Sequence, residues 1–144
     1  MLTGFDDGAP PAHPLLATVP HVLLEGLDDV EQPGAVLAAL AQSAVHARLF
    51  ALVANGAHLR ALAAFIAGTP LARAHPLVRA ELEPLFLAGG WQPLAITPIY
   101  DPSLAVPSSF PAHVDAGFAA VRVDDVEQLE RGRTAAFMVV ADRR

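Results

Sequence analysis

Residues 21–40 read HVLLEGLDDVEQPGAVLAAL, and this stretch decides the fold because its pattern changes once, at Pro33. The short apolar run His21–Glu25 ends in an acid and is followed by a glycine, which is typical of an interior strand of a parallel sheet. From Pro33 onward, apolar residues recur at helical spacing, and a proline costs little in the first turn of a helix. The stretch therefore predicts a strand followed by a helix.

The same alternation continues along the chain. Further strands are predicted at residues 48–53, 91–99 and 135–141, and further helices at residues 58–67 and 75–88. Residues 101–117 are rich in Pro and Ser and are predicted to form a loop. This order predicts an α/β three-layer sandwich, a partial Rossmann-like sheet with helices on both faces. Its C-terminal strand follows a loop rather than a helix, so we expect that strand to be antiparallel. Residues 1–18 are expected to be an irregular lead-in and residues 19–144 one domain.

Composition excludes several classes of function. The 144 residues are 53% hydrophobic and 17% charged, with a formal net charge of −6. No apolar run reaches the ~18–20 residues of a membrane span, so we expect the apolar surface to be buried in the sheet or at an interface. All basic residues are Arg and form no stripe that could neutralise phosphates, which argues against a nucleic-acid partner. The absence of Cys and Lys excludes disulfides, thiolate catalysis and Schiff-base chemistry. No signal-peptide pattern opens the chain, and we expect a cytoplasmic location.

The pentapeptide DDVEQ occurs twice, at residues 28–32 and 124–128. In each copy an Asp precedes a Glu by three residues, the spacing of a helix capping box. The residues around the two copies share nothing. The repeat therefore predicts shared capping chemistry and no internal duplication. The first copy is expected to lead into the long helix from Pro33 and the second into a short turn before residue 131.

Templates for catalytic and metal sites are mostly absent, and no catalytic residue is identified. The chain has no Gly-x-Ser-x-Gly motif, and its six His residues lack zinc-site spacing, so no metal site is predicted. Ligands of α/β sheets bind at the carboxyl ends of strands, where Glu25 and Asp28 follow the first strand and Asn55 and His58 follow the second. These four are the candidate ligand- or cofactor-binding residues.

Each candidate also has a structural interpretation. Asp28 is suited to cap a helix, and Asn55 forms a turn pair with the glycine after it. His58 fits a surface position in a first helical turn. Glu25 is the best functional candidate of the four, although a solvated strand end would explain it as well.

Four segments resemble, in their order and spacing, the C-terminal half of class I S-adenosylmethionine-dependent methyltransferases. Residues 24–29 (LEGLDD) stand where the family has a strand end of the type L-E-H-L-x-D, and residues 53–59 (VANGAHL) stand where it has V-P-N before a helix. Residues 82–91 (LEPLFLAGGW) are similar to the family's helix that ends in A-G-F, and residues 137–141 to its closing strand. The resemblance covers about residues 19–142. Gly26 and Ala54 depart from it, because the family has His and Pro at these places.

The resemblance implies S-adenosylmethionine as cofactor, which the family holds on a Gly-rich turn after its first strand. This chain has no Gly-x-Gly, and the residues before 19 are fewer than the about 30 of one strand–helix–strand unit. We therefore expect no cofactor binding by the isolated chain. The family's strand order 3-2-1-4-5-7-6 implies 4-5-7-6 here, with residues 21–25 as an edge strand.

The leading hypothesis is a methyltransferase-like half-domain without catalytic activity of its own, either a structural or interaction domain or a part of a larger protein. The edge at His21–Glu25 is expected to be covered by residues 5–18, by a homodimer or by a partner domain. One alternative is a part of an active methyltransferase completed by a partner or by a further N-terminal segment. Another is a small-ligand or protein-binding module that uses the 101–117 loop and a cleft above Glu25 and Asn55.

Overall fold

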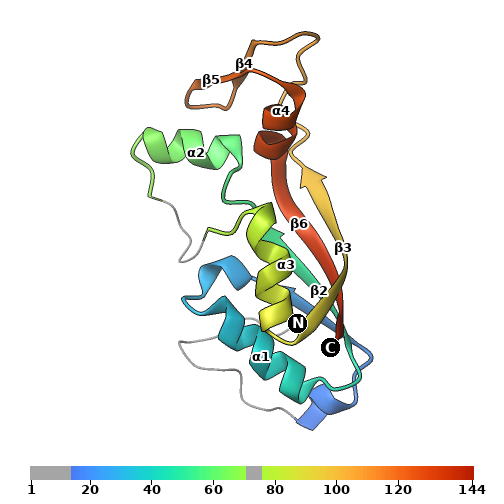
Figure 1. Ribbon diagram of the computed structural model, residues 1–144. Helices are drawn as coiled ribbons and strands as arrows, with labels where there is room; N and C mark the ends of the chain where they lie inside the picture. Colours follow the sequence, from blue (N-terminus) through green and yellow to red (C-terminus); the bar gives the residue numbers. More distant parts are fainter. Residues whose placement is uncertain (1–13, 71–75) are drawn as a thin grey trace.

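A mixed four-stranded sheet in the order β1-β2-β6-β3 forms the centre of the computed structural model, which describes residues 14–70 and 76–144 (Figure 1). Its strands are β1 (His21–Glu25), β2 (Arg48–Ala54), β3 (Trp91–Tyr100) and β6 (Thr134–Arg143). β1 pairs parallel with β2, whereas β6 runs antiparallel to both β2 and β3. The predicted strand order, the edge position of β1 and the antiparallel last strand are confirmed.

Helices α1 (Pro33–Ser43) and α3 (Arg79–Ala88) lie against one face of this sheet (Figure 1). Helices α2 (Leu59–Ile66) and α4 (Val126–Arg133) lie beyond the carboxyl end of β2. Across the described ranges, no helix layer covers the opposite face, so the predicted arrangement with helices on both faces is not confirmed. None of the helices in these ranges has both the length and the apolarity needed to cross a bilayer.

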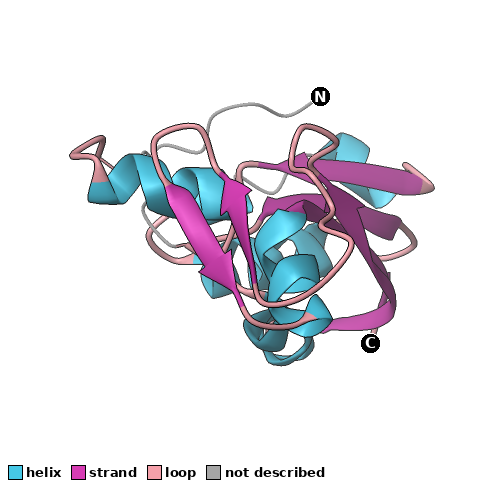
Figure 2. Cartoon of the chain, turned by 90° about the horizontal axis from the view of Figure 1, so that it is seen from above, coloured by secondary structure: helices cyan, strands magenta, loops and turns pink. Residues whose placement is uncertain are grey.

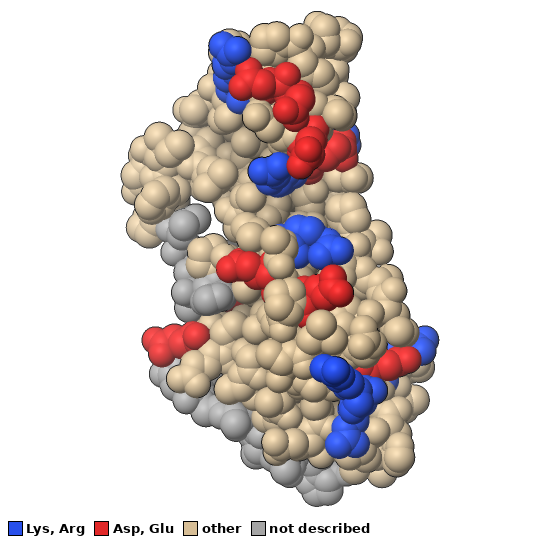
Figure 3. Space-filling model, viewed as in Figure 1, with Lys and Arg blue, Asp and Glu red and all other residues tan. Residues whose placement is uncertain are grey.

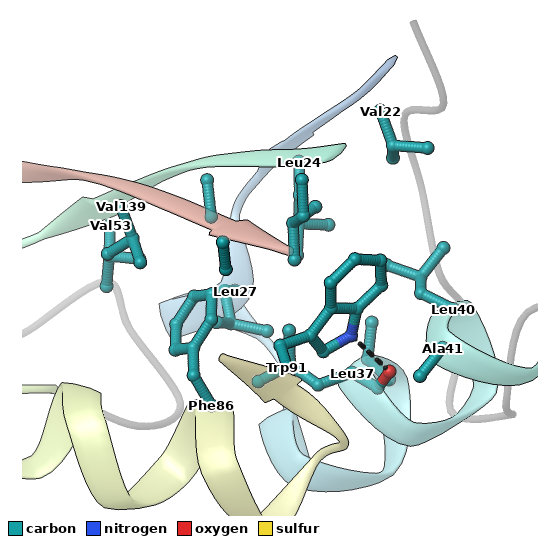
Figure 4. Packing of buried hydrophobic residues seen from close by; sticks show 14 of the residues in the cluster. Val22, Leu24, Leu27, Leu37, Leu40, Ala41, Val53, Phe86, Trp91 and Val139 are labelled. Carbon is teal, nitrogen blue, oxygen red and sulfur yellow. Dashed lines mark hydrogen bonds between the residues drawn. The ribbon is translucent and has the colours of Figure 1, made fainter. Parts of the chain in front are cut away.

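The main core fills the space between the sheet and the two helices α1 and α3 (Figure 4). Trp91, Phe86 and Leu37 are fully buried there, and the indole Nε1–H of Trp91 donates to the Leu37 carbonyl at 2.9 Å. Gly89 ends α3 where a Cβ would lie 2.5 Å from Leu37 Cβ, so only glycine allows this close approach to α1. The core thus fixes α1 and α3 to each other as well as to the sheet.

A second, smaller core lies above the carboxyl end of β2. It joins α2 and α4 to a hairpin of β4 (Ala112–Asp115) and β5 (Ala120–Val123), which Figure 2 shows from above. Gly132 of α4 approaches α2 so closely that a Cβ would lie 2.6 Å from Leu59 Cγ. The prediction of a loop over residues 101–117 is therefore wrong where β4 lies, and the short turn expected before residue 131 is the helix α4.

Side-chain capping occurs in one DDVEQ copy only, and there it uses Asp125 and Gln128 rather than the predicted Asp124 and Glu127. In the second copy Asp125 is the N-cap of α4, and its Oδ1 accepts the Gln128 N–H at 2.8 Å, while Gln128 Oε1 accepts the Asp124 N–H at 3.0 Å. In the first copy the N-cap of α1 is Gln32, which makes no side-chain cap. Pro33 begins that helix without an N–H, so one donor that a cap would satisfy is absent.

The predicted lead-in is only partly described. Residues 14–17 form the 3-10 turn η1 (Pro14–Ala17), and Leu16 in this turn is buried in the main core. Residues 1–13 lie outside the described ranges, and with them lies most of the segment 5–18 that was expected to cover the edge of β1.

Candidate functional site

Asn55 closes the carboxyl end of β2 and is almost completely buried, with 1% of its surface exposed. Its Nδ2 donates to the carbonyls of Arg131 at 3.0 Å and Thr134 at 2.7 Å, and its Oδ1 accepts the Ala57 N–H at 3.1 Å. Both amide hydrogens and the oxygen are thus used within the protein. Asn55 ties β2 to the junction of α4 and β6, a role of which the predicted turn pair is only one part.

His58 stands beside Asn55 in the chain, but its side chain has a different partner. The two residues are joined through the backbone, since the His58 N–H donates to the Asn55 carbonyl at 3.2 Å. His58 Nε2 lies 3.1 Å from Asp101 Oδ2, and both side chains are 14% exposed. The imidazole is therefore half-buried against an acid at the end of β3, and the prediction of a surface histidine is wrong.

Asp101 is the centre of a polar cluster that also includes Arg60 and Ser103. Arg60 Nε lies 3.2 Å from the same Oδ2, while the hydroxyl and the backbone N–H of Ser103 both donate to Oδ1, the latter at 2.9 Å. These two Ser103 donors, followed by the charges of His58 and Arg60, hold the pKa of Asp101 below its ordinary value, against burial, which raises it.

This cluster is arranged for structure rather than for nucleophilic catalysis. A serine nucleophile needs its hydroxyl to donate to a base such as histidine. Here the Ser103 hydroxyl donates to Asp101, and the carboxylate stands between Ser103 and His58. The cluster instead fastens the start of α2 to the segment after β3. Asp101 directly follows β3, so the expectation that ligands bind at the carboxyl ends of strands, which selected Glu25, also applies to it.

Glu25 and Asp28 follow β1 but lie in different surroundings. Asp28 is 4% exposed within η2 (Leu27–Asp29), a 3-10 turn that contacts β2. It does not cap α1, contrary to its structural interpretation. Glu25 is exposed at the end of β1. Of the four candidates, only Glu25 presents its side chain openly to solvent.

A cavity of about 760 Å³ opens between α3, α4 and the sheet, at the same end of the molecule as Asn55. Pro98 and Phe137 are apolar residues of its walls, and Tyr100 and Arg131 add polar side chains to them. A hydrogen bond to Glu130, together with burial and the charge of that carboxylate, raises the pKa of Tyr100, against the lowering effect of Arg133. The cleft that was expected above Glu25 and Asn55 is thus found at Asn55 only, because Asn55 lines this cavity and Glu25 does not.

Charged side chains form small groups of mixed sign on the face seen in Figure 3, where acidic and basic residues lie next to each other. The ion pairs Arg122–Asp124 at 2.7 Å and Arg131–Glu127 at 3.0 Å are examples. In the ranges that the structure describes, no three His, Asp or Glu side chains are grouped so that they could hold a metal ion.

The sheet face opposite α1 and α3 has an apolar centre, bordered at one end by the row of His21, Arg48 and Asp142. Strand register places Leu23, Phe50 and Val140 side by side across β1, β2 and β6, and Leu52 beside Met138 in the next row. Leu23 is 49% exposed and the other four are half-buried, whereas the alternate residues toward the helices are buried. A face of this composition is typical of an interaction surface.

No protein-family model and no curated protein sequence matches the chain. A solved structure is similar to it, described as "Complex between the Haloferax volcanii Trm112 methyltransferase activator and the putative methyltransferase". The TM-score is 0.52 at 16% identity, over 98% of this chain and 57% of that chain. The chain thus shares an α/β fold with this structure and spans little more than half the length of the chain it matches.

Proposed function

We propose that this chain is the carboxyl-terminal half of a methyltransferase-like sheet and acts as an interaction domain without catalytic activity of its own. The observation that carries this proposal is the strand order β1-β2-β6-β3, in which, among the described residues, no helix covers the face with the apolar centre and no strand pairs with the outer edge of β1. A sheet of this kind buries its apolar face and its edge against another segment or another protein. The solved structure that resembles it is itself a complex of two proteins, which supports a role in association.

The polar side chains at the strand ends support the absence of catalysis. Asn55 uses all its hydrogen-bonding groups internally, and His58 and Asp101 bind each other. A nucleoside needs donors and acceptors that are available to its ribose and base. Glu25 is the candidate that remains, and a single carboxylate does not form a nucleoside site.

Calorimetric titration with S-adenosylhomocysteine tests this proposal directly. We expect no saturable heat from the chain alone, with a complete methyltransferase as the positive control under the same conditions. Saturable binding of one molecule per chain would contradict the proposal and favour an active methyltransferase component.

The cavity favours a second candidate, a small-ligand-binding module. Its volume of about 760 Å³ lies within the 300–1,000 Å³ range that is usual for small-molecule sites. Apolar walls beside Tyr100 suit a ligand that has an aromatic body, and Arg79 and Arg131, the latter paired with Glu127, are the basic groups of the lining that an acidic group of the ligand would meet. Fluorescence titration with 8-anilinonaphthalene-1-sulfonate, an aromatic sulfonate, tests this candidate. Binding that Phe137→Ala weakens would support it, and an unchanged spectrum would exclude it.

A further inference from the structure

In the part of the chain that the structure describes, no strand pairs with the outer edge of β1, and the pairing with β2 defines which backbone groups lie on this open edge. The Arg48 N–H donates to the Pro20 carbonyl at 2.9 Å, so Pro20 directs its backbone oxygen toward β2. Backbone groups of successive residues in a strand point to alternate sides. Val22 and Leu24 therefore face β2 as Pro20 does. The N–H and C=O groups of His21, Leu23 and Glu25 point to the open edge.

The same three residues also carry the exposed side chains of β1. The strand alternates between exposed and buried positions, with Leu23 at its centre and 49% exposed. The His21 ring contacts the Phe50 ring edge to face, with centroids 5.7 Å apart, and this contact holds the imidazole over the apolar face. Glu25 stands at the other end of the strand. The edge thus presents a base, an apolar residue and an acid in a row.

We propose that this edge pairs with the same edge of a second copy of the chain, in an antiparallel register centred on Leu23. A two-fold axis then passes between the two Leu23 residues, and His21 of each copy lies opposite Glu25 of the other. All three positions become hydrogen-bonded pairs, each exchanging two backbone hydrogen bonds. This inference rests on the proposed interaction role and names the partner.

Side-chain complementarity is the reason to choose a second copy. In the antiparallel register each His21 imidazole, whose ring N–H is a donor, lies opposite a Glu25 carboxylate, which accepts, and the two Leu23 side chains meet each other. Parallel self-pairing would place like side chains together along the strand. The two apolar sheet faces would also join into one surface, because paired residues of neighbouring strands project to the same side.

The interface is small, so the dimer is expected to depend on concentration. A pair of five-residue strands buries less than the about 1,200 Å² that is usual in stable complexes. Sedimentation velocity from about 1 µM to about 500 µM covers the range in which such dimers form. We expect the mass to rise with concentration from the 15.1 kDa of the chain toward twice that value.

Leu23→Lys is the first test variant. It places two ammonium groups across the two-fold axis and is expected to weaken dimerisation about tenfold or more, as lysines do on protected edges. Leu94→Lys is the matched control, since Leu94 is 54% exposed and lies on β3, the opposite edge strand. Circular dichroism of both variants establishes that they are folded. A wild type that stays monomeric throughout, or a dimer that Leu23→Lys leaves unchanged, overturns the proposal.

Charge exchange tests the register. His21→Glu places two carboxylates opposite each other at both outer pairs, and Glu25→Lys replaces the acceptor opposite His21 by an ammonium donor, so each is expected to weaken the dimer about fivefold. The double variant places a carboxylate opposite an ammonium at both pairs and is expected to recover most of the wild-type affinity. Failure of the double variant to recover would overturn the antiparallel register.

The same samples, titrated with S-adenosylhomocysteine, separate the two proposals. Nucleoside binding contradicts only the proposed lack of a cofactor site. A monomer that binds no nucleoside contradicts only the dimer.

Discussion

Replacing Asn55 by Asp separates its structural role from a ligand-binding one. The change keeps the shape and the acceptor that receives the Ala57 N–H, but it removes both amide hydrogens. The carbonyls of Arg131 and Thr134, at 3.0 and 2.7 Å, lose this donor and face a buried carboxylate instead. Removing a partner from a buried polar group costs about 1–3 kcal/mol. For two bonds we expect Asn55→Asp to lower the free energy of unfolding by about 4 kcal/mol.

Urea unfolding monitored by tryptophan fluorescence measures this loss. The chain has one tryptophan, Trp91, which is fully buried and therefore reports on the main core. Gln42→Glu is the matched control, because it makes the same amide-to-acid change on an exposed side chain and should stay within about 0.5 kcal/mol of the wild type. A loss below about 1 kcal/mol for Asn55→Asp would refute the structural role of this side chain.

Two further predictions concern packing and pH. Gly89→Ala places a Cβ 2.5 Å from Leu37 Cβ and should lower the free energy of unfolding by about 1–3 kcal/mol. Gly34→Ala in α1 meets only ordinary contacts and should raise the free energy of unfolding by about 0.5 kcal/mol. Urea unfolding measures both changes. Ser103→Ala removes the largest cause that lowers the pKa of Asp101, so a carbon-13 NMR titration should find that pKa closer to its ordinary value. A carboxylate whose pKa is lowered in the folded state stabilises the protein at pH values above its unfolded pKa, and this stabilisation is lost as the pH falls through its folded pKa. Because Ser103→Ala makes the lowering smaller, the variant should lose less stability on acidification than the wild type. An unchanged titration curve would mean that Ser103 does not hold this carboxylate.

The main sheet could be predicted from the sequence because its signals are local. The apolar run of β1, the run of β2 before Asn55 and Pro33 at the start of α1 each specify their element within a few residues. The position of the last strand at the centre of the sheet came from the family resemblance. Its antiparallel direction came from the loop before it.

The second core, formed by α2, α4 and the β4–β5 hairpin, could not be predicted in the same way. Val114 and Val123 belong to short strands that become stable only when they are buried against α2 and α4. The partners of Asn55 lie 76 and 79 residues further along the chain, and no local pattern indicates such contacts. The sequence marks Asn55 as a turn residue, but its burial follows from tertiary packing.

Amide hydrogen exchange of β1 at low and high protein concentration is the most direct test of the claim that this edge pairs with a second copy of the chain. The Val22 and Leu24 amides face β2 and should be slow at both concentrations. The amides of His21, Leu23 and Glu25 should exchange rapidly in dilute solution and become protected as concentration rises. If these three amides remain equally fast at every concentration, the β1 edge does not associate and the claim is contradicted.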